Sequence, residues 1–234
     1  MQIRYNRLLA GAQRATGTAV IIDVFRAFTC TPLMFSLGIK KSILVSTPQE
    51  AFALKSQDKT LLLSGEVKGI PIEGFDLGNS PSEILRRGAR YFKGKTLVQR
   101  TSSGVQGALA ALDCADEVLL ASYNIARATA SYILTSRPES VSLVAMGWDL
   151  KEIAPEDEWC ARYISYLLGF SEYDHNEALR EILFNKTAQR FLRTDEPDFP
   201  AEDPSLCLQR DVYDFALQAK RRENRVVVHQ IEIR

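Results

Sequence analysis

Short apolar runs alternate with longer segments of mixed polarity along most of the chain. Runs rich in Val, Ile and Leu are typical of buried parallel strands. Six such strands are predicted over residues 18–23, 42–46, 60–64, 95–99, 117–122 and 140–145. Each is followed by a segment of helical character, beginning near Phe28, Thr47, Ser80, Val105, Asn124 and Pro155. This alternation predicts parallel βαβ units, and therefore an α/β fold of three α/β/α layers around a mainly parallel sheet.

The last third of the chain is less regular. Residues 176–192 are expected to form one or two helices, residues 194–204 an acidic loop, and residues 205–222 another helix. Residues 225–233 end in a period-two alternation and are expected to form a terminal strand, which needs a sheet edge to pair with. Since no low-complexity linker divides the sequence, the chain is expected to fold as one unit over residues 1–234.

Two of the predicted helix starts share one capping signal. Residues 47–50 and 80–83 both follow the pattern Ser/Thr-Pro-x-Glu. The hydroxyl can cap the first turn, proline suits the first helical position, and the glutamate completes a capping box. Ser80 is therefore expected to begin a helix.

Composition and charge narrow the choice of partners. The 234 residues are 46% hydrophobic, and 29 Lys and Arg residues balance 29 Asp and Glu residues. Without an overall positive field, nucleic acid and anionic membranes are not expected as partners. No segment approaches the roughly 20 apolar residues of a membrane helix, and the first residues lack the pattern of a secretory signal. We therefore expect a cytoplasmic protein in which any anion binding is local.

The cysteines and histidines do not form a metal-binding pattern. Four cysteines and two histidines are scattered, with no CxxC pair and no histidine near a cysteine. This spacing argues against a zinc site. Each cysteine is expected to be a small apolar residue in a reducing compartment rather than a ligand or a nucleophile.

Polar side chains follow four of the predicted strands, where the chain turns toward a helix. In a parallel sheet the carboxyl ends of the strands lie on one side, so groups distant in sequence can converge on one crevice. The four groups are Asp23 with Arg26, Glu66 with Asp76 and Asn79, residues 101–104, and Ser122 with Asn124. We expect the chemistry of the protein at that edge of the sheet.

Thr101, Ser102, Ser103 and Gly104 come directly before a predicted helix. They combine hydroxyl groups with free backbone N–H groups at the positive end of a helix dipole, which suits a phosphate or sulfonate oxygen. Arg100 beside them favours the same interpretation. The alternative is an ordinary helix cap with a glycine for close packing.

Three acids, Asp23, Glu66 and Asp76, lie at strand ends or just beyond them. Mg²⁺ binds through one or two such carboxylates together with water and phosphate oxygens, so these acids are candidate metal ligands. For each of them alone, a helix cap or a loop salt bridge is the alternative. Arg26 offers a planar guanidinium to a phosphate or carboxylate, or else forms an ion pair with Asp23.

Several blocks of the sequence match one family in order, over about residues 18 to 165. They are Asp23-Val-Phe-Arg26-Ala-Phe-Thr29, Gly65-Glu66 with Gly69, Ile72-Glu-Gly74-Phe-Asp76-Leu-Gly78-Asn79-Ser80-Pro81, Thr101-Ser-Ser-Gly104, Ser122 with Asn124, and Glu156-Asp157. The chain thereby resembles the 2-phosphosulfolactate phosphatase family, also called ComB. Taken alone, Glu156 and Asp157 would be assigned only as helix-start acids favoured by the dipole.

The resemblance implies a reaction and an architecture. The reaction is Mg²⁺-dependent removal of phosphate from (2R)-phospho-3-sulfolactate to leave 3-sulfolactate, a step on a route to coenzyme M. The architecture is a pair of similar, intertwined α/β/α lobes. We place them at about residues 1–115 and 116–234, with their C-terminal segments exchanged.

The resemblance weakens toward the C-terminus, where the segment from Asp203 to Asp211 matches the family only loosely. The resemblance therefore indicates the type of reaction more strongly than the identity of the substrate. The sulfonate of such a substrate needs its own cationic or N–H donors, for which Lys68, Arg100 and Arg127 are candidates.

In the expected mechanism, Mg²⁺ held by Asp23, Glu66 or Asp76 bridges the substrate phosphate. Arg26 and the turn at residues 101–104 stabilise charge on the equatorial oxygens. The nucleophile is a water or the Asp23 carboxylate, and the absence of an Asp-x-Asp pattern favours water. The other residues expected to bind substrate are Asn79, Arg100, Ser122 and Asn124.

Other functions compete with this one. A phosphatase for a different small phosphorylated acid is the alternative enzyme, and a non-catalytic protein that binds phosphometabolites or anions is the alternative from another class. A nucleotide-binding module is disfavoured because the chain has no Gly-x-Gly-x-x-Gly after its first predicted strand and no Gly-Lys-Ser/Thr loop. A homodimer is left open as the state of assembly.

Overall fold

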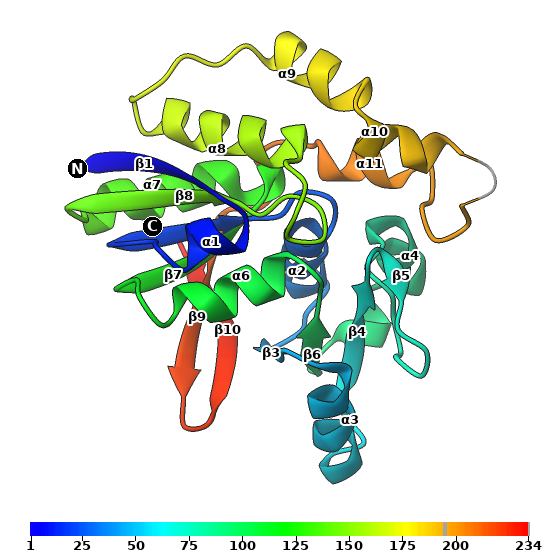
Figure 1. Ribbon diagram of the computed structural model, residues 1–234. Coiled ribbons are helices and arrows are strands. Elements are labelled where there is room, and N and C mark those ends of the chain that lie inside the picture. Colours follow the sequence, from blue (N-terminus) through cyan, green and yellow to red (C-terminus); the bar gives the residue numbers. More distant parts are fainter. Residues whose placement is uncertain (194–195, 234) are drawn as a thin grey trace.

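Ten β-strands form one mixed sheet in the computed structural model, which describes residues 1–193 and 196–233 (Figure 1). In sheet order the strands are β1 (Gln2–Arg7), β8 (Ser140–Ala145), β2 (Thr18–Ile22), β7 (Glu117–Ala121), β9 (Phe215–Arg222), β10 (Arg225–Glu232), β3 (Lys41–Leu44), β6 (Thr96–Arg100), β4 (Leu62–Val67) and β5 (Ile70–Pro71).

The sheet consists of two parallel groups joined by an antiparallel hairpin. Strands β1, β8, β2 and β7 are parallel to one another, and so are β3, β6 and β4. The hairpin of β9 and β10 pairs antiparallel with β7 on one side and with β3 on the other. The α/β class and the mostly parallel sheet are confirmed. The placement of two lobes at about residues 1–115 and 116–234 stays a prediction.

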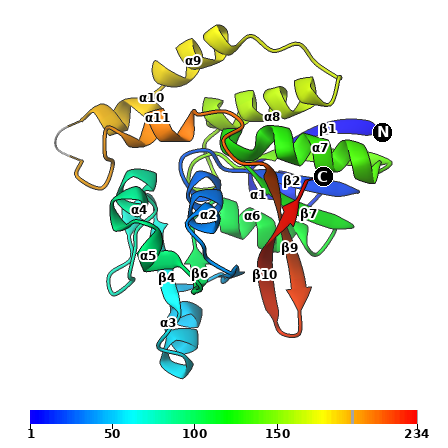
Figure 2. The ribbon, with the colours of Figure 1, turned by 180° about the vertical axis from the view of Figure 1, so that it is seen from behind.

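Helices cover both faces of the sheet (Figures 1 and 2). They are α1 (Leu8–Ala12), α2 (Ala27–Ser36), α3 (Pro48–Gln57), α4 (Pro81–Arg87), α5 (Ala89–Phe92), α6 (Gly104–Ala111), α7 (Ala126–Ser136), α8 (Pro155–Leu167), α9 (His175–Leu183), α10 (Lys186–Gln189) and α11 (Asp203–Cys207), with 3₁₀ turns at Tyr123–Ile125 and Arg190–Leu192. Within the described ranges, no helix has the length and apolar character needed to cross a membrane.

Alternate residues of the central strands enter different cores. In β2, Ala19 and Ile21 pack in the core that contains α2 and α6, whereas Val20 and Ile22 pack in the core that contains α7 and α8. Successive side chains of a strand point to opposite faces, so β2, which is apolar after Thr18 and buried throughout, fits a strand with helices on both sides.

The second parallel group is layered in the same way. Leu62 and Leu97 join the core that contains α2 and α4. The next residues along their strands, Leu63 and Val98, belong to a separate cluster with Ala51 of α3. Both groups therefore form the middle layer between helices.

Most predicted elements lie at or near their expected bounds. Strand β8 covers the predicted residues 140–145. Thr47 and Ser80 cap α3 and α4, because their hydroxyl oxygens accept hydrogen bonds from the backbone N–H groups of Glu50 and Glu83. A cap of this kind contributes about 1 kcal/mol to stability.

The predicted helix over residues 205–222 is wrong. Helix α11 ends at Cys207, and Phe215–Arg222 forms strand β9. The segment contains good helix formers, but pairing with β7 and β10 satisfies its backbone and buries its first five side chains. Strand β10, expected at a sheet edge, lies instead between β9 and β3. The edge strand β1, whose side chains are only partly buried, was not predicted.

Candidate active site

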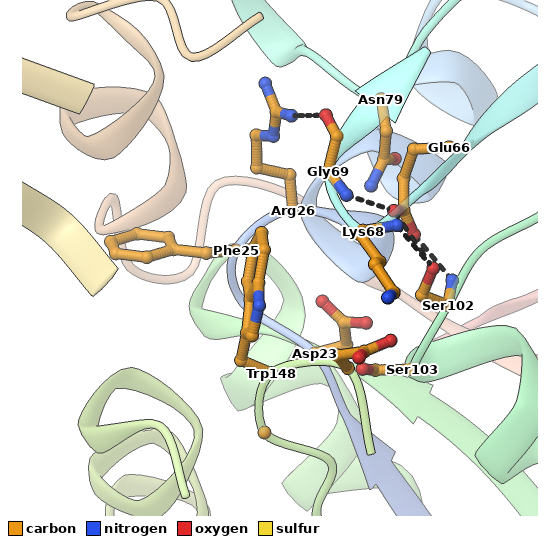
Figure 3. Close-up of a pocket in the computed structure, with 12 residues that line it drawn as sticks. Asp23, Phe25, Arg26, Glu66, Lys68, Gly69, Asn79, Ser102, Ser103 and Trp148 are labelled. Carbon is orange, nitrogen blue, oxygen red and sulfur yellow. Dashed lines mark hydrogen bonds between the residues drawn. The ribbon is translucent and has the colours of Figure 1, made fainter. Parts of the chain in front are cut away.

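A small cavity lies where strands of both parallel groups end (Figure 3). Its lining residues are Asp23, Phe25, Arg26, Glu66, Lys68, Gly69, Asn79, Ser102, Ser103, Gly147, Trp148 and Asp149. They come from the ends of β2, β4, β6 and β8 and from the loop before α4. Six of the predicted residues are brought together here: Asp23, Arg26, Glu66, Asn79, Ser102 and Ser103.

Asp23 follows β2 directly and is only 5% exposed. Its Oδ2 accepts a hydrogen bond from the Gly104 N–H at 2.7 Å, and its Oδ1 accepts one from the Ala27 N–H at 3.2 Å. These are the first residues of α6 and α2, so the carboxylate lies at the positive ends of two helix dipoles. A Cβ on Gly104 would lie 2.7 Å from Asp23 Oδ2, so this approach requires glycine.

The charge on Asp23 is nevertheless costly. Burial, and then the nearby negative charge of Glu66, raise the pKa of Asp23 to about 7, against the lowering effect of its two backbone hydrogen bonds. Burial disfavours the ionised form of a carboxyl group, and so does a second carboxylate close by. A bound cation would relieve both effects.

Glu66 belongs to β4 and is also 5% exposed. Its carboxylate accepts hydrogen bonds from the backbone N–H groups of Gly69 and Ser102 and from the Ser102 hydroxyl. These bonds fix the carboxylate between the β4–β5 turn and the loop after β6. Gly69 has φ of +82°, and a Cβ on it would meet the rings of Trp148 and Phe199, so the turn is also packed too tightly for a side chain.

The backbone N–H groups of the turn before α6 bind carboxylates of the protein itself. The N–H groups of Ser102 and Gly104 are donated to Glu66 and Asp23, and the Val105 N–H is donated to Thr101 Oγ1 at 3.1 Å. Thr101 is fully buried and does not line the cavity. The helix dipole predicted to bind substrate therefore supports the acids of the site.

Arg26 pairs with Asp203 and not with Asp23. Its guanidinium donates to Asp203 Oδ2 at 2.9 Å and to the carbonyl oxygens of Asp198 and Gly69 at 3.0 Å each. Its Cζ also lies 5.1 Å from the centre of the Phe199 ring. The predicted phosphate-binding guanidinium is thus engaged by the protein, which fixes Gly69 and the C-terminal segment in the cavity wall.

The other predicted site residues lie elsewhere. Asp76 is partly exposed, forms a salt bridge with Lys55 at 2.9 Å and accepts a hydrogen bond from the Leu63 N–H at 2.8 Å. Ser122 is fully buried, and the Asn124 amide donates to two backbone carbonyls of the C-terminal segment. Asn124 does not cap α7, whose preceding residue has no side-chain cap. None of the three lines the cavity.

Asn79 presents an acceptor without a partner. Its side chain lines the cavity and is 5% exposed, and Oδ1 makes no hydrogen bond within residues 1–193 and 196–233. A buried polar atom without a partner costs roughly 1–3 kcal/mol, so such an atom in a cavity indicates a ligand or an ordered water.

The sequence as a whole matches known proteins. A family model described as 2-phosphosulpholactate phosphatase matches residues 6–221. The chain belongs to this family. A protein of Bacillus subtilis (strain 168) named probable 2-phosphosulfolactate phosphatase is 34% identical over 205 residues, or 86% of each chain. A protein of the same name from Clostridium perfringens (strain SM101 / Type A) is 30% identical over 234 residues, covering 92% of this chain and 91% of the relative.

Membership of the 2-phosphosulpholactate phosphatase family confirms the prediction of an enzyme, a phosphoric monoester hydrolase. A third relative of the same name, from Deinococcus radiodurans, is 33% identical over 163 residues, covering 69% of this chain and 66% of the relative.

In this member of the 2-phosphosulpholactate phosphatase family, one wall of the cavity was not predicted from the polar residues at the strand ends. Gly147, Trp148 and Asp149 follow β8, whose carboxyl end points to the same crevice. Asp157 of α8 holds this wall, because its two oxygens accept the N–H groups of Val24 and Gly147 at 2.8 Å each. The Gly-Trp-Asp turn after the sixth predicted strand was the available signal.

Glu156 and Asp157 lie in the first turn of α8, as expected for helix-start acids, but both are buried. Burial, and then the charges of Asp23 and Glu156, raise the pKa of Asp157 well above its usual range. Burial also raises the pKa of Glu156 to about 7, against the lowering effect of the Thr187 hydroxyl, which donates to it at 3.0 Å.

The predicted set of three metal-binding acids is reduced to two at this cavity. Among the residues that the structure describes, no group of three or more His, Cys, Asp or Glu side chains is arranged to hold a metal ion. Asp23 and Glu66 nevertheless line the cavity with carboxylates, and Asn79, whose buried Oδ1 has no hydrogen-bond partner in the described part of the chain, lines it beside them. Such donors fit Mg²⁺, which uses one or two carboxylates and completes its coordination with water and phosphate oxygens.

Proposed function

We propose that this chain hydrolyses 2-phosphosulfolactate, or a closely similar small phosphorylated acid, to sulfolactate and phosphate in an Mg²⁺-dependent reaction. Family membership and the names of the relatives support the reaction. The observation that carries the metal dependence is the pair Asp23 and Glu66. These carboxylates are buried in one cavity, and neither forms a salt bridge in the described part of the chain.

Charge explains why this pair would bind a cation. Two carboxylates in surroundings of low dielectric constant repel each other, and the raised pKa of Asp23 reflects that repulsion together with burial. Asp23 and Glu66 would hold Mg²⁺, with Asn79 Oδ1 as a further donor. Bound there, the ion would neutralise charge on the phosphoryl oxygens of the substrate.

The residues of the chain would orient the reacting groups. Asp23 is fixed by hydrogen bonds at both of its oxygens, and Glu66 by three donors, so neither has to reorganise during the reaction. Because both Asp23 oxygens already accept N–H groups, their lone pairs are less available for attack, which favours a water nucleophile. Arg26 would position Gly69 and the wall behind it.

A phosphate-release assay tests the proposal. The protein with Mg²⁺ should release phosphate from 2-phosphosulfolactate, and excess EDTA should reduce the rate to background. A non-catalytic binding protein would bind the substrate in calorimetry while phosphate release stays at background with Mg²⁺. That result would overturn the proposal.

Variants at the acids locate the site. Asp23→Asn or Glu66→Gln should lower kcat by about 100- to 1000-fold, the range seen when one group that stabilises transition-state charge is removed. The matched control is Asp76→Asn, which removes an acid of the same loop region that lies outside the cavity. If Asp76→Asn were as damaging as Asp23→Asn in folded protein, the assignment of the site would be wrong.

A further inference from the structure

The charged residues of the cavity are not equally available to a ligand. Three acids line it, Asp23, Glu66 and Asp149, together with two basic residues, Arg26 and Lys68. The Arg26 guanidinium is already paired with a buried aspartate and two carbonyl oxygens. An anionic substrate entering this cavity therefore meets mostly negative charge, with Lys68 as the uncommitted cation among the lining residues.

Lys68 occupies the turn between β4 and β5. Its backbone is held in place, with φ of +54° and with its N–H donated to Ser102 Oγ at 2.9 Å. Its side chain is exposed to the cavity and forms no salt bridge within residues 1–193 and 196–233. Figure 3 shows the side chain extending from the turn into the cavity, on the side where Asp23 and Ser103 lie. A fixed backbone with a free ammonium suits ligand binding.

The other two candidates for the sulfonate are engaged elsewhere. Arg100 donates to the carbonyl oxygens of Glu66 and Ser46 and does not line the cavity. Arg127 forms a salt bridge with Asp211 at 3.0 Å, also outside the cavity. The three sequence-based candidates are thus reduced to one by geometry.

We propose that the Lys68 ammonium binds the sulfonate of the substrate and makes the site selective for sulfonated acids over acids that lack this group. The inference rests on the proposed function, in which the metal ion offsets the charge of the phosphate. The sulfonate then still needs a positive partner in an acidic cavity. Lysine supplies a compact charge on a flexible stem, which can follow a tetrahedral anion.

The test compares two substrates that differ only in the sulfonate. 2-Phosphosulfolactate and 2-phospholactate share the phosphate and the carboxylate, but a hydrogen replaces the sulfonate in the second. Lys68→Gln should lower kcat/KM for 2-phosphosulfolactate by about 10- to 100-fold, mainly through KM, as expected for the loss of a charge-assisted hydrogen bond. Its effect on 2-phospholactate should be at least about tenfold smaller.

Two further variants separate charge from structure. Lys68→Arg keeps the positive charge and should recover most of the selectivity for the sulfonated substrate. Lys59→Gln removes the same charge from an exposed position outside the cavity and should leave both substrates nearly unaffected. Equal losses on both substrates for Lys68→Gln, or no loss on either, would overturn the role of Lys68.

A binding experiment keeps this inference distinct from the proposed function. If the unaltered protein released phosphate from neither substrate, the proposed reaction would fail, but Lys68 could still be tested by calorimetry with 3-sulfolactate. Weakening of that binding by about tenfold or more in Lys68→Gln supports the inference, and equal binding by both proteins contradicts it.

Discussion

Two pairs of buried charged residues lie at or next to the cavity. Asp23 and Glu66 are two acids whose negative charges repel each other, whereas Arg26 and Asp203 form an ion pair at 2.9 Å. All four side chains are at least 95% buried. The difference is in their partners: Arg26 and Asp203 neutralise each other, whereas neither Asp23 nor Glu66 forms a salt bridge within residues 1–193 and 196–233.

The two pairs differ in role: the ion pair holds segments of the structure together, and the two acids are the candidates for the chemistry. Asp203 also accepts the Ser80 hydroxyl and the Ser82 N–H, so the Arg26–Asp203 pair ties the start of α4 to the loop after β2. A buried ion pair whose two partners make further hydrogen bonds is a means of fixing segments. Two acids without a counter-charge store unfavourable energy that a bound cation releases, which is characteristic of a functional site.

The largest effect is expected from breaking the ion pair. Asp203→Ala leaves the Arg26 charge buried without a partner and should reduce the free energy of unfolding by about 3–5 kcal/mol. Urea denaturation measures the loss. The matched control is Glu202→Ala, the neighbouring residue, whose ion pair with Arg86 is exposed and should contribute at most about 1 kcal/mol. Equal losses from the two variants would show that the buried ion pair stabilises the protein no more than the exposed one.

A smaller effect on stability is expected when Mg²⁺ binds to Asp23 and Glu66. Mg²⁺ at about 100 times its dissociation constant should stabilise the unaltered protein by about 2.7 kcal/mol, seen as a rise in melting temperature. Asp23→Asn should remove most of that rise, because one of the two carboxylate ligands is lost. NaCl at matched ionic strength controls for screening. The same rise in both proteins would place the metal elsewhere.

The effect with the smallest change per step of the titration concerns Glu156, a third buried acid near the pair. Its folded pKa of about 7 lies above its usual value, so the folded state holds a proton that the unfolded state releases earlier. This contribution to stability is complete below about pH 4 and is lost as pH rises toward 7, at up to about 1.4 kcal/mol per pH unit. Urea denaturation from pH 5 to 8 should therefore show the unaltered protein losing stability relative to Glu156→Gln. Parallel profiles would contradict the raised pKa.

The sequence was sufficient where one local rule governs structure. Asp23 and Glu66 could each be identified because each lies at or just after the carboxyl end of a buried apolar strand. Their meeting was not set by that rule, because the antiparallel hairpin makes the β2 group and the β4 group run in opposite directions. The same rule did not predict toward which residues the Asp76 side chain turns. Its backbone returns to β4, where its N–H is donated to the Leu63 carbonyl at 3.0 Å, and its carboxylate turns toward Lys55.

Partners distant in the chain were beyond local patterns. Arg26 and Asp203 are separated by 177 residues, and nothing in the spacing around either one indicates the other. Strand β9 was predicted as a helix for a related reason, because its residues favour helix and only its neighbours β7 and β10 impose the extended form. Long-range pairing decided both cases.

The hairpin of β9 and β10 has a consequence for how the molecule is made. It joins the two parallel groups across the middle of the sheet, yet it follows all their strands in the sequence. During synthesis from the N-terminus, the strands that carry Asp23 and Glu66 emerge long before the segment that joins their two groups. The sheet becomes continuous only when residues 215–232 have left the ribosome. Non-local pairing of this kind slows folding, so the cavity is completed late in folding.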